Sequence, residues 1–401
     1  MKRYRAALTA ILSAGVLVLT ACESGSESPG AAADDCSPGN PMTIDALVAV
    51  SGQFASVGEA MSAGMKAAVT TINDNGGVLG SPLTLDIHDN AGTADQTAAV
   101  LQELVSKGRP DAVIPGSASE MAAGIPILAN AGVFTAHHFP GTDFNDPAKY
   151  PYAFGSAHST DHYIGHLAAE LAAKGYKKIG YLRQDDAGGE AHQKTAEKYY
   201  GELGLEPEFV AVANEAIDAT PQLQKVLAGK PDALVFTAFG SLAGVMAQAR
   251  DKLDVHLPTY GTQSYSASPL NALGPESLYD EIILQSLVTS VKGTEAQRSE
   301  AFQTFYTALQ KETGGKIPFG INAYVVAYND VILAASAANL AGCVNPARMA
   351  KAIQDAEPAD LPFYVAPVDF SADDHYANFS SDWFIFHRYG PLEAGLIVPK
   401  S

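Results

Sequence analysis

The sequence predicts an α/β protein made of two lobes, each built around a parallel sheet. From Met42 onward, short runs rich in Val, Ile and Leu alternate with longer amphipathic runs, a pattern typical of βα units. The same order of elements then occurs a second time. The chain has 401 residues, 47% of them hydrophobic and 17% charged, which is enough for two or three globular domains.

The N-terminus is typical of an exported protein. Lys2, Arg3 and Arg5 precede an apolar stretch of fourteen residues, Ala6 to Leu19, shorter than the roughly 20 that span a bilayer. We see no other long apolar run, so a polytopic membrane protein is not expected. The stretch ends in Leu19-Thr20-Ala21-Cys22, which resembles the lipobox of bacterial lipoproteins. This resemblance implies cleavage after Ala21 and a lipid on Cys22; a chance cysteine behind an ordinary signal peptide is the alternative.

The residues after Cys22 favour a flexible tether, because Ser, Gly, Pro and Ala dominate from Glu23 to Asp35 and leave little apolar surface to bury. We therefore expect four parts, which are a signal peptide at 1–21, a lipidated cysteine and tether at 22–42, a first lobe of 43–155 with 289–368, and a second lobe of 156–288 with 369–401.

The charge balance excludes one class of partner. Lys and Arg number 25 against 44 Asp and Glu, a net charge of −19, and removal of residues 1–21 leaves 22 positive charges and a net charge of −22. Such a body repels nucleic acid and anionic lipid head groups. We expect no nucleic-acid partner, and contact with a membrane through the lipid alone.

The first lobe begins with alternating strands and helices. Strands are predicted at Ile44–Val50, Leu83–Ile87 and Ala112–Pro115, and helices at Glu59–Asn73 and Ala94–Lys107. The first of these helices places Met61, Met65, Ala68 and Ile72 on one face, and Asn75-Gly76-Gly77 ends it.

This unit is repeated within the chain. Gly108-Arg109-Pro110-Asp111 is matched by Gly229-Lys230-Pro231-Asp232, each leading into an apolar strand, at an offset of 121 residues. Gly58-Glu59-Ala60 is matched by Gly189-Glu190-Ala191 at an offset of 131, again after an apolar strand, Lys178–Leu182. Both matches lie in the same order of elements, which indicates two lobes of like topology that arose by duplication.

Two such lobes predict a cleft. Ligands of open parallel sheets bind beyond the carboxyl ends of the strands, where loops lead into helix N-termini. Lobes that face each other by these ends enclose a small-molecule site. We expect the chain to cross between them near 152–159, 284–291 and 363–370, so that the crossings act as a hinge.

Several motifs resemble those of a known family. These are Ser51-Gly52-x-x-Ala55-x-x-Gly58, Ile72-Asn73-x-x-Gly76-Gly77-Val78-x-Gly80-x-x-Leu83, Asp89, and Gly108-x-x-Asp111-Ala112-Val113-Ile114-x-Gly116. They resemble the solute-binding proteins of branched-chain amino acid and amide ABC transporters, over most of residues 43–340.

The resemblance implies two Rossmann-like lobes joined by three crossovers, the type I periplasmic binding protein fold. It further implies an extracytoplasmic monomer, held on the outer face of the cell membrane, that needs no cofactor or metal. Such a protein delivers a small organic ligand to permease subunits and their cytoplasmic ATPase. A ligand-sensing receptor of the same fold is an alternative function.

In that family a Ser- or Thr-rich loop at a helix N-terminus holds the ligand's carboxylate. The matching residues here are Ser117, Ala118 and Ser119, whose N–H groups and hydroxyls suit an anion, although Ser119 could serve only as a helix cap. The next loop departs from the family and has His137, His138 and Phe139, which we take as ligand contacts or as a strand end without a ligand.

The remaining candidates come from the other loops. The first loop supplies Gln53 and Phe54, and the second lobe supplies Asp185, Phe239, Gln263 and Tyr265. Amino acid binders of the family place a carboxylate near the position of Gln263 to neutralise the ligand's ammonium group. We expect a hydrophobic or branched-chain amino acid, an amide or a small carboxylate as the ligand. Unless Asp185 or Asp186 turns inward, the absence of this carboxylate weakens the amino acid interpretation and raises amides, urea-like molecules and small carboxylates.

Cysteine and histidine spacings suggest further chemistry. An exported chain with Cys36 and Cys343 as its remaining cysteines favours a disulfide between them. His158, His162 and His166 are four residues apart, but on a helical wheel His162 and His166 fall opposite the apolar face, so we expect them in solvent and no metal site.

An enzyme is the main rival class of function. The chain contains none of the common nucleophile, phosphate-loop, dinucleotide or zinc-protease motifs. The chemistry that stays open is acid–base catalysis by Asp185 or Asp186 with His137. We expect no enzyme.

Overall fold

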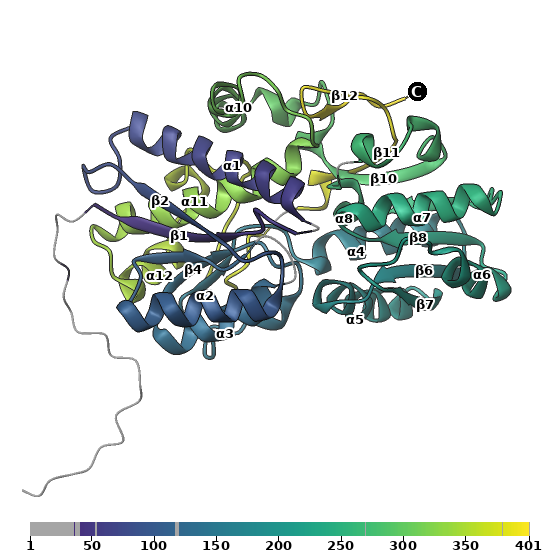
Figure 1. Ribbon diagram of the computed structural model, residues 1–401, viewed down its shortest axis with the longest axis horizontal. Coiled ribbons are helices and arrows are strands. Elements are labelled where there is room, and N and C mark those ends of the chain that lie inside the picture. The colour runs from purple at the N-terminus through teal and green to yellow at the C-terminus, as the bar shows by residue number, and fades with distance from the viewer. Residues whose placement is uncertain are drawn as a thin grey trace, which may run out of the picture. The chain divides into compact units, whose positions relative to one another are not determined.

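Two sheets organise the computed structural model, which describes residues 36, 41–52, 54–116, 120–268, 270–378 and 380–400. The first sheet is parallel and has the strand order β2-β1-β3-β4-β5. The second has the order β11-β10-β9-β8-β6-β7, and only its edge strand β11 is antiparallel. Helices cover both faces of each sheet, so this is an α/β fold with two lobes (Figure 1).

The elements of the first repeat are β1 Thr43–Val48, α1 Ala55–Asp74, β2 Thr84–Asp89, α2 Ala94–Lys107, β3 Ala112–Ile114, α3 Met121–Ala131, β4 Phe134–His137 and β5 Ala153–Gly155. Those of the second are α4 Thr160–Ala173, β6 Lys178–Gln184, α5 Ala187–Glu202, β7 Glu206–Val212, α6 Thr220–Ala228, β8 Ala233–Thr237, α7 Ser241–Lys252, β9 Thr259–Gly261, α8 Gln263–Ser266, α9 Leu270–Leu273 and β10 Ile282–Leu287.

The C-terminal part adds α10 Glu300–Thr313, α11 Ile321–Ala341, α12 Pro346–Gln354, β11 Phe384–Arg388, β12 Leu392–Glu393 and β13 Leu396–Ile397. Short 3-10 turns η1 to η6 lie at Thr142–Phe144, Glu276–Leu278, Val288–Ser290, Glu295–Arg298, Pro358–Asp360 and Ser381–Trp383. The predicted helix at 59–73 begins earlier, at Ala55, since the N–H groups of Val57 and Gly58 bond the carbonyl of Phe54.

The repeated motifs make equivalent contacts in both lobes. Asp111 accepts a hydrogen bond from Thr43 N at 3.0 Å, at the start of β1, and Asp232 accepts from Lys178 N at 2.9 Å, at the start of β6. A Cβ at Gly58 would lie 2.1 Å from the carbonyl oxygen of Ala49, and one at Gly189 would lie 2.0 Å from that of Gln184. In each lobe this glycine lets a helix approach the end of the strand that precedes it, α1 after β1 and α5 after β6.

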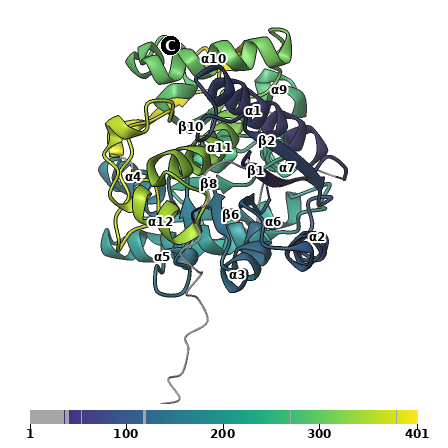
Figure 2. The ribbon, with the colours of Figure 1, turned by 90° about the vertical axis from the view of Figure 1, so that its left-hand side faces the viewer.

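Helix α11 forms the centre of the first lobe. It packs against α1, which also contacts α10, as both views show (Figures 1 and 2). By length and composition this helix could cross a membrane, yet it is buried inside the protein, as is typical of a core helix. Asn322, Asn329 and Asp330 interrupt its apolar sequence.

The chain passes between the lobes after β5, after β10 and before β11. The first crossing follows β5, and the second follows β10 through Val288–Ser290, both near the predicted positions. The third does not lie at 363–370, because Phe370 and Ala377 are buried in the core of the first lobe. Ala377 N bonds the carbonyl of Gly155 at the edge of β5, so the chain leaves for β11 only after this point, and the predicted start of the second-lobe segment at 369 is too early.

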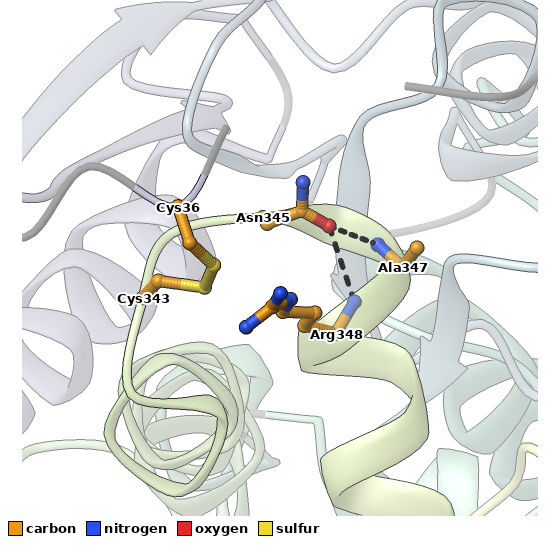
Figure 3. The surroundings of a disulfide bond; sticks show 5 residues. All are labelled: Cys36, Cys343, Asn345, Ala347 and Arg348. Atoms are coloured by element: carbon orange, nitrogen blue, oxygen red, sulfur yellow. Dashed lines mark hydrogen bonds between the residues drawn. A yellow bond between two sulfur atoms is a disulfide. The ribbon is translucent and has the colours of Figure 1, made fainter. Parts of the chain in front are cut away.

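A disulfide joins Cys36 to Cys343, which lies in the turn between α11 and α12 (Figure 3). The two Cα atoms are 5.4 Å apart and 307 residues apart in sequence. Beside it, the Asn345 side chain caps α12 by accepting from the N–H groups of Ala347 and Arg348. The segment before β1 is thereby attached to the first lobe. Cys22 and the rest of the predicted signal and tether lie outside the described residues.

Candidate functional site

A cavity of about 100 Å³ lies between the two lobes, beyond the carboxyl ends of their strands. Its lining residues come from both lobes and are Phe54, Met61, Met121, His138, Pro140, Ala157, His158, Gln184, Gly188, His192, Phe239, Gln263, Ser264, Ala267, Asn322, Ala323 and Val326. None of these carries a carboxylate, an ammonium or a guanidinium group. The cavity is therefore suited to a small molecule with an apolar body and a few polar atoms.

Helix N-termini surround this cavity. Met121 begins α3, Gly188 lies in the first turn of α5, and Asn322 lies in the first turn of α11. The N-terminus of a helix carries a partial positive charge of about half an electron charge. The N–H groups at such ends favour a hydrogen-bond-accepting group beside them. Asp186 already caps α5, and Glu120 precedes α3.

Two phenylalanines provide the aromatic wall. Phe54 precedes α1 in the first lobe, and Phe239 follows β8 in the second. A Cβ on Gly92 would lie 2.7 Å from the ring of Phe54, and one on Gly240 would lie 3.3 Å from it. Gly240 has φ +71°, a conformation that favours glycine, so the backbone can approach the ring closely. The ring of Phe54 thus lies between glycines of the two lobes.

His138 is oriented by a buried carboxylate. Its Nδ1 lies 2.6 Å from Oδ2 of Asp330, which is on α11 and fully buried. The other oxygen of Asp330 accepts a short hydrogen bond from the hydroxyl of Ser156. Nε2 lies on the other side of the ring from Asp330 and is buried.

His192 is neutral and its hydrogen bonds are determined by its neighbours. Nδ1 lies 2.6 Å from the carbonyl oxygen of Gly188, an acceptor, so Nδ1 carries the proton. Nε2 then accepts from the hydroxyl of Tyr163 at 2.5 Å or that of Ser264 at 3.0 Å. Burial lowers the pKa of His192 to about 4, and burial raises the pKa of Tyr163. This network presents the Ser264 hydroxyl to the cavity.

His158, Gln263 and Gln184 complete the polar part of the lining in the second lobe. Burial lowers the pKa of His158 to about 4, against a smaller opposing effect of its hydrogen bond with Gln263. Gln184 is held at both ends, since its Oε1 accepts from Phe239 N at 2.7 Å and its Nε2 donates to Asp186. The side chains of His158, Gln263 and Gln184 are therefore uncharged, and their hydrogen bonds fix their orientation.

Asn322 brings a buried polar group from the first lobe. Its Oδ1 has no hydrogen-bond partner among the described residues, and the side chain is buried at the cavity. An unsatisfied buried amide oxygen is destabilising by roughly 1–3 kcal/mol. A ligand that donates to it would remove this cost.

Comparison with protein families and structures agrees with this architecture. The family model described as periplasmic binding protein matches residues 41–387. The chain belongs to the periplasmic binding protein family.

Solved structures of this fold are similar over nearly the whole chain. The periplasmic binding protein type 1 from Bordetella pertussis Tohama I has a TM-score of 0.78 at 17% identity, covering 90% of this chain and 100% of that one. An ABC transporter solute binding protein from R. palustris in complex with benzoate has a TM-score of 0.75 at 18% identity, with 90% and 95% covered.

A branched-chain amino acid transporter substrate binding protein from Streptococcus pneumoniae, in complex with isoleucine, has a TM-score of 0.72 at 20% identity, with 89% and 98% covered. At these identities the likeness establishes the fold. A comparison with curated proteins finds no match.

The structure of this periplasmic binding protein places four of the predicted site residues in the cavity lining, namely Phe54, His138, Phe239 and Gln263. Gln53, Ser117, Ala118 and Ser119 lie outside the described residues. Met121, which follows the predicted Ser-rich loop, lines the cavity.

Four other predicted residues lie elsewhere. His137 is buried beneath the loop, with its ring against Tyr376, and burial lowers its pKa to about 3. Phe139 packs into a cluster with Phe144. Side chains alternate in direction along β4 and the segment after it. The side chains of His137 and Phe139 therefore point away from the direction taken by His138, which lines the cavity.

Asp185 and Tyr265 are also absent from the lining. The Asp185 side chain is exposed and lies 3.6 Å from Arg183 Nη1. Tyr265 packs in the core of the second lobe and donates to the carbonyl of Ala243 at 2.8 Å. Asp186 caps α5 by accepting from Gly189 N. The acid–base arrangement of Asp185 or Asp186 with His137 is therefore not assembled in this periplasmic binding protein.

The two histidines of α4, His162 and His166, differ from the helical-wheel expectation, and His158 lies before this helix. His162 and His166 are partly buried rather than solvent-directed, because β11 covers this face and the rings of His166 and Phe386 stack at 4.9 Å. His158 lines the cavity. Among the described residues there is no group of three or more His, Cys, Asp or Glu side chains placed to hold a metal ion.

Sequence reasoning missed several lining residues. Gln184 and Ser264 each neighbour a predicted residue, Asp185 and Gln263, so the correct loops were found with the wrong side-chain direction. His192 could have been found from helix spacing, because it lies four residues after Gly188 and therefore on the same face of α5. Asn322 and Val326 come from α11, outside both repeats, and the duplication could not point to them.

Proposed function

We propose that this protein is the extracytoplasmic solute-binding component of an ABC importer, which captures a small organic ligand between its lobes. The observation that carries the proposal is the cavity itself, which both lobes line with apolar side chains and a few oriented polar groups. Structures of the same fold bind benzoate and isoleucine, ligands of the size that such a cavity accepts. Permease subunits with a cytoplasmic ATPase are the expected partners.

Binding of the ligand would favour closure of the two lobes. Residues of both lobes would touch one ligand, so the ligand would favour the closed arrangement over an open one, with the three crossings as the hinge. The two bodies that would move are the lobes, built around 43–155 and 156–288, each completed by a C-terminal segment. We expect a monomer.

The N-terminal sequence supports attachment to the outer face of the cell membrane. Cleavage after Ala21 and lipidation of Cys22 would leave a tether that reaches the first lobe at Cys36, where the disulfide attaches it. A lipid anchor keeps the protein near its permease without need of charge attraction.

Isothermal titration calorimetry of the mature protein against amino acids, amides and small carboxylates tests this function. Binding of at least one compound at micromolar concentration or tighter, with the compound recovered unchanged after incubation, is the expected result. Chemical conversion of the bound compound would contradict a transport function and support an enzyme. Hydrophobic amino acids, amides and small carboxylates are the classes to include first.

A further inference from the structure

The cavity lacks a partner for a positively charged ligand group. In the described part of the chain, three carboxylates that lie close in sequence to lining residues have other contacts. Asp185 is exposed beside Arg183, Asp186 caps α5, and Glu120 accepts from Asn90 at 3.2 Å. An ammonium group enclosed here would have no adjacent counter-charge, and an unpaired buried charge is strongly unfavourable. The lining therefore discriminates against α-amino acids.

The fourth carboxylate, Asp330, determines the chemistry of His138. Asp330 is fully buried, and the groups described around it are His138, the Ser156 hydroxyl and the Tyr364 phenol. Within the described residues, His138 is the one basic side chain in an ion pair with it. A buried carboxylate of this kind is compensated when the histidine beside it is an imidazolium.

An imidazolium at position 138 has N–H groups on both ring nitrogens. In that form Nδ1 would donate to Asp330, and Nε2 would be a second donor. Burial lowers the pKa of His137, His158 and His192, whereas His138 is the described lining histidine that pairs with a buried carboxylate. The N-terminus of α11, which has no acidic residue in its first turn, adds positive potential beside the cavity.

Resting on the proposed function, we propose that the ligand is a small organic carboxylate without an ammonium group, whose carboxylate binds His138 while its apolar body packs against Phe54 and Phe239. Asp330 is a positioning residue, since it acts on the ligand through His138. A charge-assisted hydrogen bond to His138 distinguishes the acid from its neutral amide.

Matched compounds on one carbon skeleton separate the possibilities. Calorimetry would compare 4-methylpentanoate, 4-methylpentanamide and leucine, and then benzoate and benzamide. We expect each acid to bind at least tenfold more tightly than its amide, and 4-methylpentanoate at least tenfold more tightly than leucine. Tighter binding of leucine or of the amides would overturn the proposed ligand class and leave the transport function intact. Failure of every class of compound to bind would overturn the transport function.

Variants test whether His138 recognises the carboxylate of the ligand. His138→Gln alone would leave Asp330 as an unpaired buried charge, so the main variant combines His138→Gln with Asp330→Asn. It should lose the preference for acid over amide, with amide affinity changed less than threefold. The matched control is His88→Gln with Asp45→Asn, a second His–Asp pair with 2.7 Å between Nε2 and Oδ1, outside the cavity. Retention of the acid preference by the His138 and Asp330 double variant would overturn the inference.

Discussion

The ring of Phe54, from the first lobe, lies against the backbone of Gly240, from the second. A side chain at Gly240 would begin 3.3 Å from this ring, and the left-handed φ of +71° there disfavours any residue with a Cβ. The contact joins the two lobes directly at the edge of the cavity, so the same ring contributes to ligand contact and to lobe closure.

Phe54→Ala should weaken ligand binding by about five- to thirtyfold, since burial of an aromatic side chain contributes roughly 1–2 kcal/mol when it is partial. Calorimetry with the tightest compound found measures the change. Phe209→Ala is the control, because Phe209 is also partly buried and packs on Tyr181 away from the cavity. Equal affinity of the Phe54 variant and the control would contradict the role of this ring.

Gly141→Leu should hold the lobes apart. A Cβ at Gly141 would lie 2.7 Å from Cβ of Ala191 on α5, so a larger side chain prevents α5 from packing on this loop. We expect at least tenfold weaker binding and a larger radius of gyration by small-angle X-ray scattering with ligand present. Gly201→Leu, on the same helix in open space, should leave both unchanged.

The ion pair beside this contact should matter far less. Lys194 and Asp143 join the same two segments, but their side chains are largely exposed. Exposed ion pairs contribute about 0.2–1 kcal/mol, so Lys194→Ala should weaken ligand binding by less than fivefold in the same calorimetric assay. A loss as large as that of Gly141→Leu would show that charge, rather than shape, controls closure.

Stability should fall as the pH falls from 6.5 to 4. Burial lowers the pKa of His158 and of His192 to about 4, below the unfolded value of about 6.5. Between these values the unfolded chain binds more protons than the folded one, so the free energy of unfolding rises with pH and levels off above 6.5. Each histidine should account for a loss on the order of 2 kcal/mol between pH 7 and pH 5.

Urea denaturation at both pH values measures this loss. His192→Gln should reduce the difference, whereas His256→Gln, at an exposed position, should retain the wild-type difference. A wild-type protein that becomes more stable at pH 5 would refute the assignment of buried neutral histidines.

Removal of the disulfide should destabilise the protein by roughly 2–5 kcal/mol, because the bond between Cys36 and Cys343 closes a long loop and restricts the unfolded chain. The variant with both cysteines changed to Ser would be compared with wild type in urea, with and without dithiothreitol. The reductant should destabilise wild type alone. An equal response of both proteins would argue against this pairing.

Cys22→Ser should release the full-length protein from membranes when it is expressed in a bacterial host that processes lipoproteins. Lipidation requires the thiol, and the negative charge of the chain offers no other attraction to anionic lipid. Fractionation followed by immunoblotting measures the distribution. Continued membrane association of the variant would contradict anchoring through Cys22.

Much of the fold could be predicted from the sequence because duplication repeats a physical constraint. Asp111 and Asp232 each bond the first N–H group of a neighbouring strand, and Gly58 and Gly189 each allow a helix to approach a strand end. Such requirements leave the same residue in both copies. The third crossing has no counterpart in the repeat, and its position at the edge of β5 depends on packing of Phe370 and Ala377 in the first lobe.

The site was predicted less well than the fold. Loop positions follow from topology, which located Phe54, Phe239 and Gln263. Side-chain direction depends on where each strand ends, and a difference of one residue separates His138 in the cavity from His137 in the core. Asn322 was missed since a helix as apolar as α11 shows no pattern that distinguishes its one cavity-facing turn from its buried body.

Helix α11 has two roles that constrain how the binding specificity of this protein can change. It fills the core of the first lobe and also presents Asn322, Ala323 and Val326 to the cavity. Substitutions there alter folding and ligand recognition together, whereas the loops that present Phe54 and Phe239 can vary with little effect on the core. We therefore expect specificity for new ligands to change through the loops, while the helix preserves the shape into which those ligands must fit.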